Sequence, residues 1–173
     1  CHPVIISTVT IACYISGHGF GHASRTIEVI NALVDRRPDI RVIIRSEVAP
    51  WLVERTVRAG VRLEAAPTDT GVVQIGSLAL DERATVDRAR AFMATFPARV
   101  AAEVEWLRKI GAALLVADLP PLGIAAARAA AQGQDAQQVE RYDIAGAFPD
   151  GIDRRFAVMP RHRPFLDIAG AAK

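Results

Sequence analysis

A buried strand that runs directly into a glycine-rich turn is the feature that most constrains this fold. The apolar run Thr10–Ser16 is typical of a parallel strand covered on both faces, and it continues as Gly17-His18-Gly19-Phe20-Gly21-His22. Glycine lacks Cβ, so the backbone of such a turn can adopt positive φ and let a ligand approach its N–H groups. A helix that begins directly after the turn directs unpaired N–H groups toward that ligand. We therefore expect an anion to bind there.

Two histidines lie in this turn. His18 and His22 can exchange protons near neutral pH, which a simple phosphate site does not require. Each could instead be a histidine that only satisfies neighbouring polar groups, and glycines also serve tight turns that bind nothing. The turn therefore predicts a binding site, with the two histidines as candidate catalytic residues.

Helical and strand patterns alternate along the chain. Apolar residues recur at helical spacing after the turn, and continuous apolar runs follow between glycine and proline signals. The alternation predicts an α/β fold with a Rossmann-like parallel sheet and helices on both faces. The expected strands cover Thr10–Ser16, Ile40–Arg45, Val61–Ala65 and Ala112–Ala117. The expected helices cover His22–Arg36, Pro50–Ala59, Asp81–Lys109 and Gly123–Ala131.

Two interruptions and a change of pattern define the remaining organisation. Residues 67–80 have mixed character with two glycines, typical of a long loop or a broken element. Pro97 marks a kink or a boundary within the third helical stretch. No clear further strand and helix follow the last helix. We expect a Rossmann-like domain over residues 1–131 and a divergent or truncated tail over residues 132–173.

Asp118 follows the fourth expected strand directly. Ligands of open α/β sheets bind at the carboxyl ends of the strands, so Asp118 and the turn at residues 17–22 are expected to share one rim. The carboxylate could orient a histidine there. Asp118 could also simply cap the helix that follows it.

Composition bounds the class of protein and its partners. The chain has 173 residues, of which 51% are hydrophobic and 23% charged, as expected for one globular α/β domain. The net charge of +2 comes from interleaved residues, so we expect no nucleic-acid partner. Two cysteines, Cys1 and Cys13, indicate neither a disulfide framework nor a zinc site, and a cytoplasmic location is expected. No transmembrane segment is indicated, and no carboxylate or histidine cluster has metal-ligand spacing.

The glycines also permit a nicotinamide-binding domain, but their spacing argues against it. The third position of that fingerprint is occupied by His22, whose ring would obstruct close contact between helix and strand. Glu47, together with Arg45, could still bind a ribose, so this alternative stays open. No Lys-Ser or Lys-Thr pair closes the glycine run, which excludes a Walker phosphate loop and makes a sugar kinase an unlikely assignment.

Residues 16–25, Ser-Gly-His-Gly-Phe-Gly-His-Ala-Ser-Arg, resemble the amino-terminal motif of GT-B glycosyltransferase-like proteins. In particular, they resemble the glycosyltransferase-like domain fused ahead of plant L-arabinokinases and its bacterial relatives. Further matching pieces follow in the same order and spacing at Thr70–Gln74, around Asp81, at Val104–Leu107 and at Leu115–Pro121. The resemblance covers about residues 9–130.

This resemblance implies a two-domain enzyme. The amino-terminal Rossmann-like half would bind the acceptor, and the carboxyl-terminal half would hold a nucleotide-sugar donor across a cleft. Two such domains need about twice this length, so the resemblance implies that the donor-binding half is missing here and that this half is inactive without it. No cofactor is implied beyond the donor, which is a substrate.

The resemblance also gives the residues expected roles. His22 or His18 would remove the proton from an acceptor hydroxyl as it attacks the anomeric carbon, and Asp118 would orient a histidine or bind acceptor hydroxyls. The helix N-terminus would stabilise charge on the departing phosphate. The residues expected to bind substrate or phosphate are Gly17, Gly19, Phe20, Gly21, Ser24 and Arg25. The alternative is a non-catalytic module that binds sugar or phosphate and regulates a partner.

Overall fold

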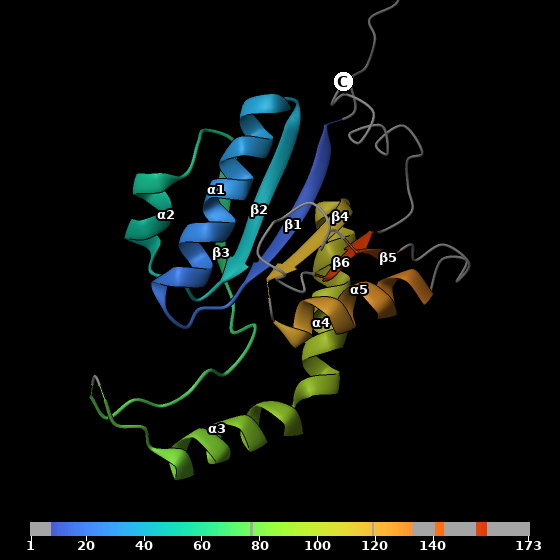
Figure 1. Cartoon of the computed structure of the whole chain (residues 1–173). Coiled ribbons are helices and arrows are strands. Elements are labelled where there is room, and N and C mark those ends of the chain that lie inside the picture. The colour runs from blue at the N-terminus through green and yellow to red at the C-terminus, as the bar shows by residue number, and fades with distance from the viewer. Residues whose placement is uncertain (1–7, 77, 119, 133–140, 144–154, 159–173) are drawn as a thin grey trace, which may run out of the picture.

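The computed structural model describes residues 8–76, 78–118, 120–132, 141–143 and 155–158, which form one twisted sheet with helices on both faces (Figure 1). The strands are β1 Val9–Ile15, β2 Ile40–Ser46, β3 Val61–Ala65, β4 Ala112–Asp118, β5 Arg141–Asp143 and β6 Arg155–Val158. The helices are α1 Phe20–Arg36, α2 Pro50–Thr56, α3 Glu82–Ala94, α4 Phe96–Ile110 and α5 Pro121–Gln132.

The sheet has the order β3-β2-β1-β4-β6-β5. Strands β1 to β4 are all parallel to their neighbours within this group, which confirms the expected Rossmann-like α/β fold. Strand β6 pairs antiparallel with β4, and β5 pairs antiparallel with β6. Both lie within the segment for which the sequence predicted no further strand and helix unit. The division into a domain and a divergent tail remains a prediction.

Helices cover the two faces of the sheet because its central strands are apolar on both sides. On one face, α1 and α2 pack over Ile11, Cys13, Ile15 and the facing residues of β2. On the other face, α4 and α5 pack over Ala12, Tyr14 and the facing residues of β4. These two cores hold the carboxyl ends of β1 and β4 in place.

Element boundaries shift where glycine and proline act. Helix α1 begins at Phe20, two residues before the expected start, because Gly19 with φ 82° ends the turn immediately before it. Pro97 lies in the first turn of α4, where its missing N–H needs no partner, and Thr95 separates α3 from α4. The long helical stretch is therefore two helices, and α3 extends away from the sheet (Figure 1).

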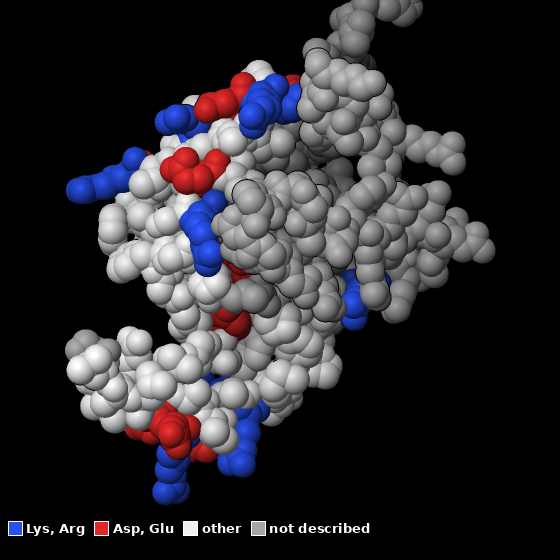
Figure 2. Space-filling view, in the orientation of Figure 1, with Lys and Arg blue, Asp and Glu red and all other residues white. Residues whose placement is uncertain are grey.

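Two features of the described residues bear on partners. On the face shown in Figure 2, acidic and basic side chains are interspersed over the described surface. On this face, the described residues do not gather into the basic patch that is typical of nucleic-acid binding. Among the helices that the structure describes, none combines the length and the apolar composition needed to span a membrane.

Candidate functional site

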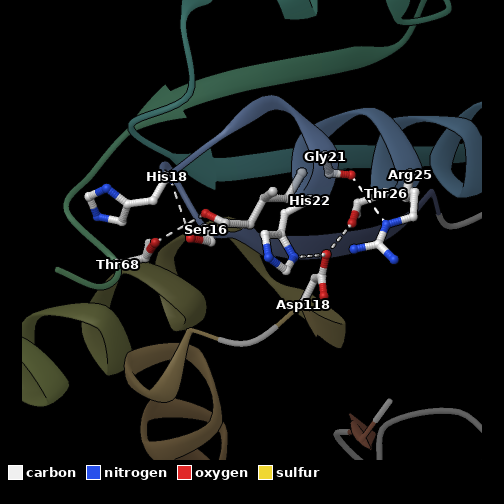
Figure 3. Close-up of polar contacts among 9 residues, drawn as sticks. Ser16, His18, Gly21, His22, Arg25, Thr26, Thr68 and Asp118 are labelled. Atoms are coloured by element: carbon white, nitrogen blue, oxygen red, sulfur yellow. Dashed lines mark hydrogen bonds and ion pairs between the residues drawn. The ribbon is translucent and has the colours of Figure 1, made fainter. Parts of the chain in front are cut away.

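The carboxyl ends of β1 and β4 bring His22 and Asp118 together. Ile15 pairs with Asp118 in the parallel register of these strands, so the turn after β1 starts beside the Asp118 carboxylate. The His22 Nδ1 atom lies 3.3 Å from Asp118 Oδ2. Thr26, one turn further along α1, donates its hydroxyl hydrogen to the same oxygen over 3.0 Å (Figure 3). The rim expected from the sequence is present, and it includes Thr26, which sequence reasoning missed.

Asp118 and His22 are each partly accessible. Their side chains retain 21% and 31% of their surface, which allows a solute to reach the pair. When His22 Nδ1 carries the proton and faces the carboxylate, the other ring nitrogen, Nε2, has the free lone pair of a general base. Asp118 contacts α1 through His22 and Thr26, and the capping role considered from the sequence stays an alternative.

Three glycines shape the turn for different reasons. A Cβ at Gly17 would lie 3.0 Å from the Cβ of Glu47, so close packing restricts that position. Gly19 has φ +82°, which disfavours any residue with a side chain. At Gly21, nothing among the described residues lies within 4 Å of the place that a Cβ would occupy. Close packing therefore explains the glycine at position 17, and the positive φ explains the one at position 19. Neither reason applies to Gly21, where the space is open among the described residues.

The start of α1 is open to a ligand. No side chain caps the N-terminus of this 17-residue helix, and its N-cap is Gly19. Its first N–H groups carry partial positive charge, which favours an anion in front of them. Ser24 is exposed, and the Arg25 guanidinium is turned back so that Nε donates to the Gly21 carbonyl over 3.3 Å. The phosphate contacts expected of Ser24 and Arg25 remain predictions.

Phe20 lies on the surface beside another aromatic residue. Its side chain is 60% exposed, and its ring centroid is 5.8 Å from that of Trp51 on α2. Trp51 is itself 49% exposed. The predicted substrate contact of Phe20 would therefore be made by an aromatic pair at the α1 and α2 ends.

His18 pairs with a carboxylate that sequence reasoning missed. Its Nε2 lies 3.2 Å from Oδ1 of Asp69, in the loop that follows β3. The backbone N–H of His18 donates to Ser16 Oγ over 3.3 Å (Figure 3). The loop at residues 67–80 has no periodic pattern, so only a polar residue soon after a strand hinted that Asp69 reaches the rim.

Arg45 is engaged inside the protein. Its guanidinium donates to both carboxylate oxygens of Glu103 on α4, over 3.1 Å and 2.8 Å, and stacks over the Trp106 ring at 4.6 Å. Tyr14 donates its hydroxyl hydrogen to the same carboxylate. Burial alone would lower the pKa of Arg45, but the hydrogen bonds and charge of Glu103 outweigh it and raise that pKa. Burial and Glu103 raise the pKa of Tyr14. Because Arg45 binds Glu103, it is not available for the ribose site considered for nicotinamide binding. Of the two residues named for that site, only Glu47 remains.

No group of three or more histidine, cysteine or carboxylate side chains that could hold a metal ion occurs in the described part of the chain. The arrangement at the rim is instead suited to proton transfer and anion binding. It comprises two histidine and carboxylate pairs and the N-terminus of α1, which no side chain caps.

Comparison with known proteins gives a sequence relative and a structural neighbour. No protein-family model matches the chain. It is 34% identical over 122 residues to L-arabinokinase of Arabidopsis thaliana, a match that covers 69% of this chain and 12% of the relative. The chain thus spans about an eighth of that protein. A crystal structure of a UGT transferase from Siraitia grosvenorii in complex with UDP has 20% identity and a TM-score of 0.45, covering 72% of this chain and 26% of the other.

Proposed function

We propose that this chain is the acceptor-binding half of a glycosyltransferase that transfers a sugar from a nucleotide-sugar donor to an acceptor hydroxyl. The observation that carries the proposal is the contact between His22 Nδ1 and Asp118 Oδ2 at the carboxyl edge of the sheet. The resemblance of residues 16–25 to the GT-B motif and the similarity to a segment of L-arabinokinase support it.

His22 is the general base in this proposal. Its Nε2 accepts the proton of the acceptor hydroxyl while the hydroxyl oxygen forms a bond to the anomeric carbon of the donor. The bond between that carbon and the diphosphate oxygen breaks, and the nucleoside diphosphate leaves with the electron pair. Asp118 holds the ring and stabilises the imidazolium that forms, and the N-terminus of α1 favours negative charge on the departing phosphate.

The proposal makes this chain one half of an active unit. The donor-binding half belongs to a second domain outside these residues, so the chain alone binds acceptor without turning over a nucleotide sugar. Calorimetric titration of UDP-, GDP- and dTDP-sugars tests this division. We expect no binding to the chain alone, and we expect binding of one donor to the longest polypeptide that its gene encodes. Failure of that longer polypeptide to bind any donor of the panel would contradict the proposal.

A non-catalytic binding module is the second candidate. The observation that favours it is that the sequence relative is named as a sugar kinase, of which this chain matches only 12%. Such a module would bind sugar or phosphate at the same rim and influence a partner. It would bind its ligand equally well with glutamine in place of His22 and would release no nucleoside diphosphate.

A further inference from the structure

The imidazole of His18 is held in one place by the loop that follows β3. Asp69 Oδ1 lies 3.2 Å from Nε2, and the two side chains are 17% and 32% exposed. The loop is itself anchored, because the buried Thr68 donates its hydroxyl hydrogen to the Ile15 carbonyl over 3.2 Å. His18 is therefore pre-organised on the rim.

Gly71 fits the loop closely around the ring. Its φ is +49°, and a Cβ there would lie 2.1 Å from Cγ of His18. Contacts under 3.0 Å are not tolerated, and Cγ lies too near the His18 backbone to move away easily. The Gly71 backbone thus packs closely against the imidazole near Cγ, Cδ2 and Nδ1.

The two ring nitrogens of His18 differ in their surroundings. Nε2 is buried and has no hydrogen bond among the described residues, since its contact with Asp69 meets only the distance of an ion pair. In the neutral ring, a carboxylate facing Nε2 favours the tautomer that carries its proton on Nε2. Nδ1 then carries the lone pair, and in the described part of the chain it has no partner. In that tautomer Nδ1 can accept a hydrogen bond, and the His18 side chain as a whole is 32% exposed.

We infer that His18 Nδ1 accepts a hydrogen bond from a second hydroxyl of the acceptor, so the acceptor is a sugar or another polyol. This inference rests on the proposed function, in which His22 contacts the first, reacting hydroxyl. His18 and His22 lie on either side of Ser16 in Figure 3. His18 pairs with Asp69, and His22 pairs with Asp118. His18 is a specificity-determining residue, and Asp69 is the positioning residue that acts through it.

Histidine-selective NMR on the whole chain tests this inference. The probes are L-arabinose, D-glucose and myo-inositol, with 1-propanol as the compound that carries a single hydroxyl. The ring signals of His18 and His22 are assigned with His18→Gln and His22→Gln. We expect one of the polyols to shift both rings along a common binding curve, and 1-propanol to leave His18 unchanged.

Variants of the loop complete the test. We expect His18→Gln and Asp69→Asn to raise the Kd of that polyol about tenfold, the effect of losing one hydrogen bond. Asp69→Asn should also shift the ring nitrogen signals of His18 toward the other tautomer, which a purely structural role would not do. Asp87→Asn, an exposed carboxylate on α3, is the matched control and should leave Kd unchanged.

The outcomes separate this inference from the proposed function. A polyol that shifts His22 but not His18 would overturn the role of His18 and leave the transferase proposal intact. An equal response of His18 to 1-propanol would also overturn it. If no polyol shifts either ring, both the inference and acceptor binding at this rim are wrong.

Discussion

His22 and Asp118 are 96 residues apart in the sequence, yet His22 Nδ1 lies 3.3 Å from Asp118 Oδ2. The pairing depends on the parallel register of β1 and β4, which ends both strands at the same edge. It gives a histidine at the start of a helix the orientation and the negative partner that a general base needs. The first prediction concerns this contact.

We expect His22→Gln to lower the rate of sugar transfer about 10²- to 10⁴-fold, the range for loss of a general base. Asp118→Asn should lower it by at least about 10²-fold, because an amide neither fixes the tautomer nor stabilises the imidazolium. Thr26→Val removes one hydrogen bond to Asp118 and should change the rate less than about tenfold. The measurement is kcat at saturating acceptor. Equal rates for Thr26→Val and Asp118→Asn would refute an electrostatic role for Asp118.

A second prediction concerns Gly71. Gly71→Ala should destabilise the fold by more than the roughly 1–2 kcal/mol of left-handed backbone strain, because the new methyl meets the His18 ring. In a His18→Ala background the methyl finds space, and only the strain should remain. Gly111→Ala is the matched control, since Gly111 has φ +63° and nothing within 4 Å of the methyl position. Urea unfolding of the four variants measures the coupling. Additive effects would show that Gly71 and His18 are not in contact.

A third prediction concerns Glu103. Its side chain is 7% exposed and accepts hydrogen bonds from Arg45 and Tyr14. Glu103→Ala leaves the Arg45 charge without its partner, so we expect a loss of about 3–5 kcal/mol in the free energy of unfolding. Tyr14→Phe removes only one hydrogen bond and should lose about 1–2 kcal/mol.

The control for Glu103 lies on the same helix. Glu105 is 74% exposed and pairs with Arg108, so Glu105→Ala should lose at most about 0.5 kcal/mol. Urea denaturation gives all three values. If Glu103→Ala and Glu105→Ala lost equal stability, the buried pair would contribute no more than a surface one.

A fourth prediction concerns Cys13, which is buried in β1. Burial raises the pKa of its thiol from 9.0 to about 12. In a Cys1→Ser background, we expect no reaction with Ellman's reagent at pH 8 in the native state and full reaction in guanidinium. The unfolded chain loses this proton at lower pH than the folded one, so the thiol makes stability fall as pH rises from about 9 toward 12. Fast native labelling at pH 8 would contradict the buried position.

The fold could be predicted largely from local signals. Continuous apolar runs between glycine and proline residues gave the four parallel strands, and Asp118 could be placed at the rim because parallel strands end at one edge. The predicted start of α1 lies two residues after the observed start at Phe20. The sequence does not reveal the φ angle that Gly19 adopts just before the helix. Strands β5 and β6 were missed because three- and four-residue strands carry almost no periodicity.

The second histidine pair could not be predicted. Asp69 reaches His18 through a loop whose path depends on the anchoring of Thr68 to the end of β1. Loop paths follow tertiary contacts and not sequence period, so residues 67–80 indicated only that a long loop was present. For Arg45, the sequence suggested contact with a ligand, whereas the structure has an ion pair inside the protein. Its position at the end of β2 was compatible with ribose binding, and only the packing of α4 reveals its partner, Glu103.

Release of nucleoside diphosphate in the presence and absence of a polyol acceptor is the most direct test of the transferase proposal. The measurement uses the longest polypeptide encoded by the gene, a panel of UDP-, GDP- and dTDP-sugars, and a His22→Gln variant beside the parent protein. We predict acceptor-dependent release from one donor, reduced at least about 10²-fold by His22→Gln. Equal release by the variant, or no acceptor-dependent release from any donor, would contradict the assignment of His22 and Asp118 to sugar transfer.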